Sequence, residues 1–288
     1  MKKIPFLSML FFVATLLFSC QKEEGLTPNP RATKSTYNNS SGGDGIIYAI
    51  TQKNQLRWYL HVGRYDGSFS WATDSSRLVG SGWNYKHVFY GGDDVIYAIN
   101  DQNQLLWLRH EGRFDGSFRW ATEPKVVGSG WNFKQVFSGG DGVIYAINDQ
   151  NQLLWYRHEG RYDGSVNWTN GGVAKVVGTG WNFKQVFYGG DGVIYTISQT
   201  NQLRWFRHVG RFDGSFSWAT GSGRLVGSGW NFKQVFPGGY GVIYAINDQN
   251  QLLWYRHEGR FDGSFSWANN ANGKVVGTGW DFKQVFSD

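Results

Sequence analysis

Gly-Gly-Asp-Gly-Val-Ile-Tyr-Ala-Ile, residues 139–147, opens a unit that the chain repeats five times with few changes. The same copy continues through Leu-Leu-Trp-Tyr-Arg-His (153–158), Asp-Gly-Ser (163–165) and Gly-Trp-Asn-Phe-Lys-Gln-Val-Phe (180–187). A period of 48 to 51 residues is that of propeller blades rather than of short solenoid repeats. The five copies run over residues 42–90, 91–138, 139–188, 189–237 and 238–288.

Each copy contains four short apolar stretches separated by turn residues. Their β-branched and aromatic side chains predict strands, and the Asn, Asp and Gly clusters between them predict turns. No copy has a helical periodicity of useful length. The sequence therefore predicts an all-β fold, a five-bladed β-propeller whose blades are four-stranded antiparallel sheets. In the second copy the predicted strands are residues 95–99, 105–110, 118–127 and 131–137.

The loop lengths indicate where one blade ends and the next begins. A short Gly-Gly-Asp-Gly turn joins residues 133–137 to 143–147, which predicts a hairpin within one blade. The Gly-Ser-Gly joint before Trp131 would then cross between blades. Residues 282–286 lack a following partner and residues 46–50 lack a preceding one. We expect these two stretches to pair and close the ring, which removes an exposed sheet edge.

The N-terminus has the pattern of an export signal. Lys2 and Lys3 precede an apolar run that ends at Ser19 and Cys20, the only cysteine of the chain. Leu17-Phe18-Ser19-Cys20 resembles a bacterial lipobox, so residues 1–19 are interpreted as a lipoprotein signal peptide and Cys20 as the lipidated residue. A plain signal peptide with an incidental cysteine is the alternative. Residues 20–41 are rich in Pro, Thr, Asn and Ser and predict a flexible tether.

The expected location follows from this leader. We expect an exported outer-membrane or cell-surface lipoprotein, held at the membrane through Cys20, and the sequence leaves periplasmic and outward display open. The net charge of +6 falls to about +3 once the leader and tail are left out. This charge is spread evenly over the repeats, which argues against a nucleic-acid partner.

Residues 213–246, from the fourth copy into the start of the fifth, carry a family resemblance. Asp-Gly-Ser-Phe-Ser-Trp-Ala (213–219), Leu-Val-Gly-Ser-Gly-Trp-Asn-Phe-Lys-Gln-Val-Phe (225–236) and Gly-Gly-Tyr-Gly-Val-Ile-Tyr-Ala-Ile (238–246) resemble the tachylectin family. That resemblance covers all five copies and implies a five-bladed propeller lectin that binds N-acetylated amino sugars, one site per blade. The second predicted strand departs from the family, because Leu-Trp-Tyr-Arg-His and a charged loop replace its Pro-rich stretch.

Each copy also offers the groups that sugar binding requires: an aromatic face for the C–H surface of the ring and polar groups for its hydroxyls. We predict a site where the Asp-Gly-Ser loop and third strand of one blade meet the Gly-Trp-Asn joint leading into the next. Turn formation for the aspartates and core packing for the tryptophans are the alternatives, and we expect one exposed and two buried Trp per copy. The candidate residues are Asp66, Asp115, Asp163, Asp213 and Asp262; Trp71, Trp120, Trp168, Trp218 and Trp267; Trp83, Trp131, Trp181, Trp230 and Trp280; and Asn84, Asn132, Asn182 and Asn231, with Asp281 in the fifth copy.

Other chemistries fit the sequence less well. One Arg-His pair per blade cannot gather metal ligands, because a ring holds equivalent residues far apart. A propeller glycosidase needs carboxylates that converge from dissimilar blades, whereas these acidic residues repeat with the unit. We therefore expect no enzyme, no cofactor and no metal, and a monomer whose partners are glycans of the N-acetylglucosamine or N-acetylgalactosamine type. A protein–protein adhesion scaffold and a structural surface-layer component are the alternatives.

Overall fold

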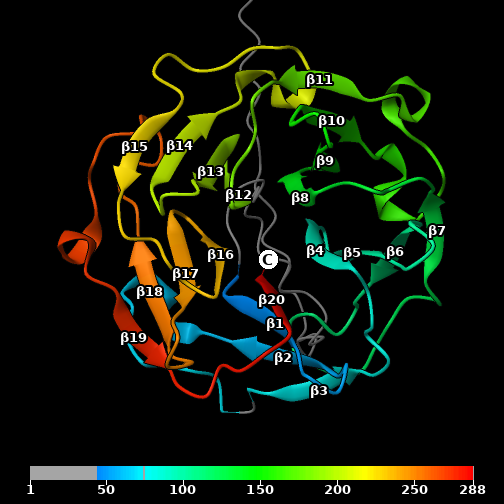
Figure 1. The fold of residues 1–288 in the computed structure, drawn as a ribbon. Helices are drawn as coiled ribbons and strands as arrows, with labels where there is room; N and C mark the ends of the chain where they lie inside the picture. The colour runs from blue at the N-terminus through cyan, green and yellow to red at the C-terminus, as the bar shows by residue number, and fades with distance from the viewer. Residues whose placement is uncertain (1–43, 74, 288) are drawn as a thin grey trace, which may run out of the picture. The chain divides into compact units, whose positions relative to one another are not determined.

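The structure, a computed structural model, describes residues 44–73 and 75–287, so the predicted signal peptide, Cys20 and the tether lie outside the described residues. The described strands form five four-stranded antiparallel sheets arranged in a ring (Figure 1). The predicted five-bladed propeller is confirmed. From the inner to the outer strand the blades are β20 (Gln284–Ser287), β1 (Ile46–Ile50), β2 (Leu56–Leu60), β3 (Arg77–Gly80); β4 (His87–Gly92), β5 (Val95–Ile99), β6 (Leu105–Arg109), β7 (Lys125–Gly128); β8 (Gln135–Gly140), β9 (Val143–Ile147), β10 (Leu153–Arg157), β11 (Lys175–Gly178); β12 (Gln185–Gly190), β13 (Val193–Ile197), β14 (Leu203–Arg207), β15 (Arg224–Gly227); and β16 (Gln234–Gly239), β17 (Val242–Ile246), β18 (Leu252–Arg256), β19 (Lys274–Gly277).

The ring closes as expected, with the last strand completing the first blade. β20 runs antiparallel to β1, with Phe286 opposite Tyr48 and Gln284 opposite Ile50. The hairpin predicted across Gly-Gly-Asp-Gly is the β8–β9 pair. The Gly-Ser-Gly joint links the outer strand β7 to the inner strand β8, so it does cross between blades. Every blade except the first is thus built from the end of one repeat and the start of the next.

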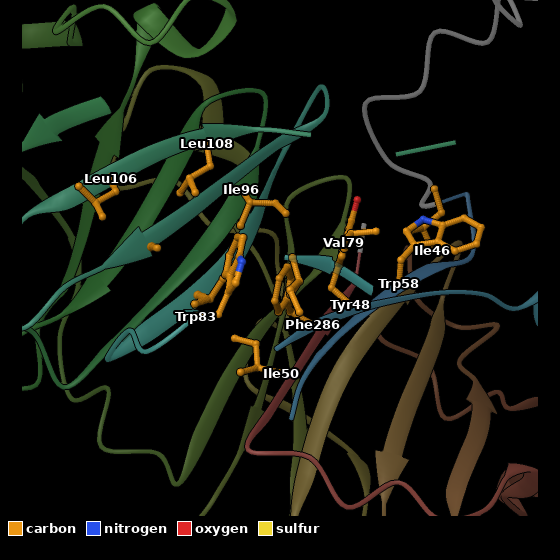
Figure 2. Close-up of a cluster of buried hydrophobic side chains, with 13 residues drawn as sticks. Ile46, Tyr48, Ile50, Trp58, Val79, Trp83, Ile96, Leu106, Leu108 and Phe286 are labelled. Atoms are coloured by element: carbon orange, nitrogen blue, oxygen red, sulfur yellow. The ribbon is translucent and has the colours of Figure 1, made fainter. Parts of the chain in front are cut away.

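The second strand of each blade forms the centre of the core. All five residues of β1, β5, β9, β13 and β17 are buried, because neighbouring blades cover both faces of each sheet. Figure 2 shows one such region, where Tyr48 and Phe286 of the first blade lie near Ile96 of the second and Trp83 of the joint between them. The rings of Tyr48 and Phe286 stack with centroids 5.3 Å apart. Continuous apolar strands are therefore what this sandwiched position requires.

The outermost strand of each blade, which is the third predicted strand of each copy, is shorter than the sequence predicted. In the second copy it covers only β7, Lys125–Gly128, instead of residues 118–127. The Phe118 side chain is 63% exposed, and Trp120 forms only an isolated antiparallel bridge with His110. The backbone N–H groups of this segment bond within the loop, as Arg119 N–H does to the Ser117 carbonyl at 2.8 Å. The prediction of a continuous strand was wrong because a compact loop satisfies these groups first.

Short 3-10 helices are the helical elements of the described chain, and all of them lie between the two outermost strands of a blade. They have four residues each, and they leave the all-β character of the fold unchanged. They are η1 (Val62–Tyr65), η2 (Glu159–Tyr162), η3 (Thr169–Gly172), η4 (Val209–Phe212) and η5 (Ala268–Ala271).

A buried histidine and a tyrosine join each pair of neighbouring blades. The hydroxyl of Tyr97 donates to Nδ1 of His158 at 2.7 Å, and the Nε2–H of that ring donates to the Ser165 carbonyl at 2.8 Å. The same pair recurs around the ring with O···Nδ1 distances of 2.6–2.8 Å. Each of these histidines is at most 1% exposed, whereas the preceding Arg109, Arg157, Arg207 and Arg256 are half-buried. One member of the Arg-His pair packs and the other reaches solvent, as the strand alternation predicted.

The Asp of Gly-Gly-Asp-Gly links blades by a second contact. Asp141 accepts a hydrogen bond from the Arg211 guanidinium at 2.9 Å, and Asp191 accepts one from Arg260 at 2.9 Å. At the seam where the ring closes, Tyr240 takes the place of the Asp, and the Arg64 guanidinium lies 5.3 Å from the centroid of its ring. A cation–π contact thus replaces an ion pair at that seam.

Candidate functional site

Two tryptophans from consecutive repeats meet at every boundary between blades. We call the Trp of the Gly-Trp-Asn joint the joint tryptophan and the Trp paired with the buried His the bridge tryptophan. Their ring centroids are 5.5–5.8 Å apart at all five boundaries. Each joint tryptophan contacts the bridge tryptophan of the next repeat, and the fifth contacts that of the first. The pairs are Trp83–Trp120, Trp131–Trp168, Trp181–Trp218, Trp230–Trp267 and Trp280–Trp71.

Backbone contacts fix both rings of a pair. The Nε1–H of Trp168 donates to the Val127 carbonyl of the preceding repeat at 2.8 Å, and its ring lies 4.5 Å from that of His158. The backbone N–H of Trp131 donates to the Asn103 carbonyl at 2.9 Å. A partly buried aromatic pair held in this way is rigid and presents its remaining surface in one orientation.

The accessible tryptophan of each copy is the bridge tryptophan. The joint tryptophans are 5–6% exposed, and the tryptophans of β2, β6, β10, β14 and β18, such as Trp107, are 1–3% exposed. Four bridge tryptophans are half-buried, and Trp267 is 9% exposed. Two buried Trp per copy are found as expected, but the expected exposed Trp is half-buried in four copies and buried in the fifth, because the bridge tryptophan packs against the joint tryptophan and the His ring.

A hollow lies over the tryptophan pair at two of these boundaries. At the Trp131–Trp168 pair its volume is about 250 Å³, and at the Trp230–Trp267 pair it is about 160 Å³. Gly128, Ser129 and Gly130 of the joint form one side of the larger hollow, and Tyr156 of the next repeat lines it as well. Gly227, Ser228, Gly229 and Tyr255 occupy the equivalent places in the other hollow. Each hollow therefore combines aromatic walls with a glycine-rich polar backbone.

The candidate aspartates lie outside the lining of both hollows. The carboxylate of Asp213 is exposed and accepts a hydrogen bond from the Ser215 backbone N–H at 2.9 Å, which closes its own turn. This hydrogen bond lowers the pKa of the Asp213 carboxyl, and the same cause acts at Asp66, Asp163 and Asp262. The loop itself packs on the preceding repeat, where the Lys175 ammonium donates to the Asp213 carbonyl at 2.6 Å. The structure thus gives these residues a turn-forming role, and their part in sugar binding stays a prediction.

The candidate amides also stand apart from the two hollows. Asn84 and Asn231 are exposed, and their side-chain oxygens accept hydrogen bonds from Lys283 and Lys184 at 2.8 and 3.0 Å. Asp281, the fifth-copy counterpart, is exposed too. The joint therefore contributes its tryptophan, its glycines and its hydroxyl to the hollow, while the residue after the tryptophan points elsewhere.

Sequence reasoning missed three positions that line the hollows. Tyr156 lies on β10 and Tyr255 on β18. Phe133 and Phe232 each follow the joint tryptophan by two residues. Phe265 is 69% exposed and lies at the edge of the smaller hollow. The signal available in the sequence was the Ser-Phe-Ser-Trp alternation, which places two large aromatic side chains on the same face of an exposed segment.

The described residues contain no group of three or more His, Cys, Asp or Glu side chains that could hold a metal ion. Within the same residues no helix is long and apolar enough to cross a membrane.

A family model and one solved structure agree with this architecture. A family model described as Tachylectin matches residues 49–285. A structure solved in work on the de novo evolutionary emergence of a symmetrical protein superposes with a TM-score of 0.57 at 21% identity, over 84% of this chain and 98% of that one, and shows the same fold. A functionally unknown protein from Desulfotomaculum acetoxidans gives a TM-score of 0.39 at 11% identity, over 81% of this chain and 67% of that one. A search of curated protein sequences returned no match. Because the family model spans all five repeats, the chain belongs to the tachylectin family.

Proposed function

We propose that the protein is a multivalent lectin for N-acetylated amino sugars, N-acetylglucosamine or N-acetylgalactosamine, with about one site per blade. The observation that carries this proposal is the hollow over the joint and bridge tryptophans, which combines aromatic walls with the glycine-rich joint. Membership of a lectin family supports a carbohydrate ligand. The proposed site lies at the boundary between blades. In it the serine and backbone of the joint, rather than the candidate Asp and Asn side chains, supply the polar groups that contact the sugar.

The chemistry of the hollow suits a single sugar ring. The exposed face of Trp168 offers apolar contact for ring C–H groups, and the Ser129 hydroxyl with the neighbouring backbone offers hydrogen-bond partners. Volumes of about 160 and 250 Å³ lie below the roughly 300–1,000 Å³ of pockets for drug-sized ligands. We therefore expect recognition of one terminal sugar with weak affinity per site.

The ring arrangement supplies what a weak site lacks. The tryptophan pair recurs at all five boundaries, so a glycan-coated surface can engage several sites of one molecule at once. Linked sites raise the effective concentration of each further contact and convert weak single-site binding into avidity. Multivalent surface binding is thus the property that a near-exact repeat serves best.

A protein–protein adhesion scaffold is the second candidate. Phe69, Phe118, Phe216 and Phe265, one from each of four repeats, are 63–69% exposed and could contact a protein partner. Binding that free N-acetylglucosamine and N-acetylgalactosamine fail to compete would favour the scaffold. Competition by either sugar would favour the lectin.

Blocking one hollow tests the proposed site. Gly229 lines the smaller hollow, has φ +73°, and a Cβ added there would have no other atom within 4 Å. Asn tolerates positive φ better than other side chains, so Gly229→Asn should fill the hollow at little cost to the fold. We expect calorimetric titration with free N-acetylglucosamine or N-acetylgalactosamine to show one site fewer per molecule, with the affinity of the other sites unchanged.

Gly92→Asn is the matched control. Gly92 has φ +87° and equally open surroundings, yet it lines neither of the two hollows. This variant should keep the stoichiometry of the unaltered protein. Equal stoichiometry in both variants would place the sugar elsewhere, and an absence of heat with either sugar in the unaltered protein would contradict the lectin proposal itself.

We also propose that the propeller is displayed at the outer membrane or cell surface through a lipid on Cys20. The lipobox-like sequence before this single cysteine supports the proposal. In a bacterial host, metabolic labelling with a fatty acid should mark the unaltered protein, and Cys20→Ser should abolish the label. Label retained in that variant would overturn the anchor.

A further inference from the structure

One aromatic position differs among the five boundaries and carries a hydroxyl at only some of them. The residue beside the joint tryptophan on β2, β6, β10, β14 or β18 is a tyrosine at three boundaries, with ring centroids 4.9 Å apart in the pairs Tyr59–Trp280, Tyr156–Trp131 and Tyr255–Trp230. At the Trp181 boundary the residue is Phe206, 5.0 Å from the joint ring. At the Trp83 boundary it is Leu108, which belongs to the same buried cluster as Trp83.

At the Trp83 boundary a different position carries the tyrosine hydroxyl. The residue two places after the joint tryptophan is phenylalanine in four copies, and Tyr85 takes that position only in the first copy. Its ring lies 5.6 Å from that of Trp83, as Phe133 lies 5.7 Å from Trp131. The one boundary that has leucine in place of an aromatic residue is thus the one that has a tyrosine two residues after its joint tryptophan. Four boundaries carry one tyrosine each, and the Trp181 boundary, with Phe206 and Phe183, carries none.

Two of these four tyrosines belong to a hollow over a tryptophan pair. Tyr156 and Tyr255 line the two hollows, and their hydroxyls make no hydrogen bond to any described residue. The Tyr59 hydroxyl has one partner, the Ser76 hydroxyl at 3.3 Å. Burial raises the pKa of Tyr59, Tyr85, Tyr156 and Tyr255, so each phenol stays protonated and can donate.

We propose that this tyrosine hydroxyl sets the specificity of each site, giving four sites that hydrogen-bond the sugar and one apolar site at Trp181. The inference rests on the lectin function proposed above and deepens it. A phenol that donates to a sugar hydroxyl or to an acetamido carbonyl adds one hydrogen bond to stacking on the bridge tryptophan. The Trp181 site lacks that bond and should bind N-acetylated sugars more weakly by roughly three- to tenfold.

Single-site variants make the comparison direct. Asn at four of the five glycines Gly82, Gly130, Gly180, Gly229 and Gly279 leaves one boundary open, and each of these glycines has φ +73° or +74° and open surroundings. In the variant open only at Trp181, Phe206→Tyr should tighten binding of N-acetylglucosamine or N-acetylgalactosamine by roughly three- to tenfold. In the variant open only at Trp131, Tyr156→Phe should weaken it by the same factor.

The Trp83 boundary offers a rescue. With only that boundary open, Tyr85→Phe should weaken sugar binding. The further change Leu108→Tyr should restore it, because it places a hydroxyl on β6 at the position that Tyr156 has on β10. Equal affinity at the Trp181 and Trp131 boundaries, or no gain from Phe206→Tyr, would overturn the inference while leaving the lectin function intact. Loss of all sugar binding in the unaltered protein would instead overturn the function on which the inference rests.

Discussion

With four of its five boundaries blocked, the protein should bind a glycan-coated surface about 10²–10⁴-fold more weakly, while its one open site keeps its affinity for free sugar. The blocked glycines are Gly82, Gly130, Gly180 and Gly279, which leaves the Trp230–Trp267 boundary open. The loss arises because a molecule with one site dissociates in a single step, whereas one with five sites remains held by the others. Surface plasmon resonance on an immobilised N-acetylated glycan and titration with the free sugar measure the two quantities separately.

The free-sugar titration is the internal control for folding. Asn already occupies positive φ in this chain, at +56° in Asn54 and +57° in Asn103, so the four substitutions place a tolerated residue in a tolerated conformation. A variant that binds one free sugar per molecule is therefore folded. An unchanged surface affinity in that variant would show that one boundary does all the binding and would contradict the multivalent function.

The fold was predictable because the same pattern of strand and turn residues recurs in all five copies. Strand composition, turn residues and the length of the glycine-rich hairpin were each visible in five copies, and the pairing of residues 282–286 with residues 46–50 followed from counting unpartnered strands, although its register did not. The segment from Phe118 to Trp120 was less predictable, since its alternating pattern suits a strand and only the hydrogen bonds within the loop decide otherwise. In this segment the hydrogen bonds of the loop outweigh the strand propensity of the residues.

The site was harder to predict because it joins two repeats. Trp131 and Trp168 are 37 residues apart in the chain, and the sequence does not say whether a joint meets the tryptophan of its own repeat or that of the next. Asp163 was a candidate because Asp is a frequent sugar ligand, yet its carboxylate closes a local turn with Ser165. Tyr156 was overlooked because a tyrosine within a strand resembles core. Contacts between blades, which only the structure reveals, decide both cases.

We expect the free energy of unfolding to fall steeply as the pH drops below about 6.5, the usual pKa of histidine in an unfolded chain. Burial is the largest effect and lowers the pKa of His61, His110, His158, His208 and His257. The hydrogen bonds to Ser carbonyls and the nearby Asp carboxylates raise it by less, and Arg64, Arg113, Arg161 and Arg211 add the smallest effect, a further lowering at four of the histidines. Below pH 6.5 these histidines therefore bind protons in the unfolded chain but stay neutral in the folded chain. The stability is fully present above that pH and is lost as the pH falls toward the lowered pKa values.

The size of the effect comes from the repeat. Each histidine that is protonated only in the unfolded state contributes a slope of up to about 1.4 kcal/mol per pH unit, so five give about 7 kcal/mol per unit. His87, whose pKa burial also lowers, acts in the same direction. Carboxylates with lowered pKa, such as Asp213, titrate well below this window and leave it undisturbed. Urea unfolding between pH 7.5 and 5 measures the slope.

A single substitution identifies the groups responsible. His208→Gln removes one titrating ring between Tyr145 and Ser215, so it should lower stability at pH 7.5 yet reduce the acid slope by about one fifth of the five-histidine total. Because the His208 ring lies 4.6 Å from bridge Trp218, sugar binding should be lost over the same pH range as the fold. Stability that stays constant from pH 7.5 to 5 would show that these histidines accept protons inside the folded ring, with their hydrogen bonds to tyrosine and serine rearranged.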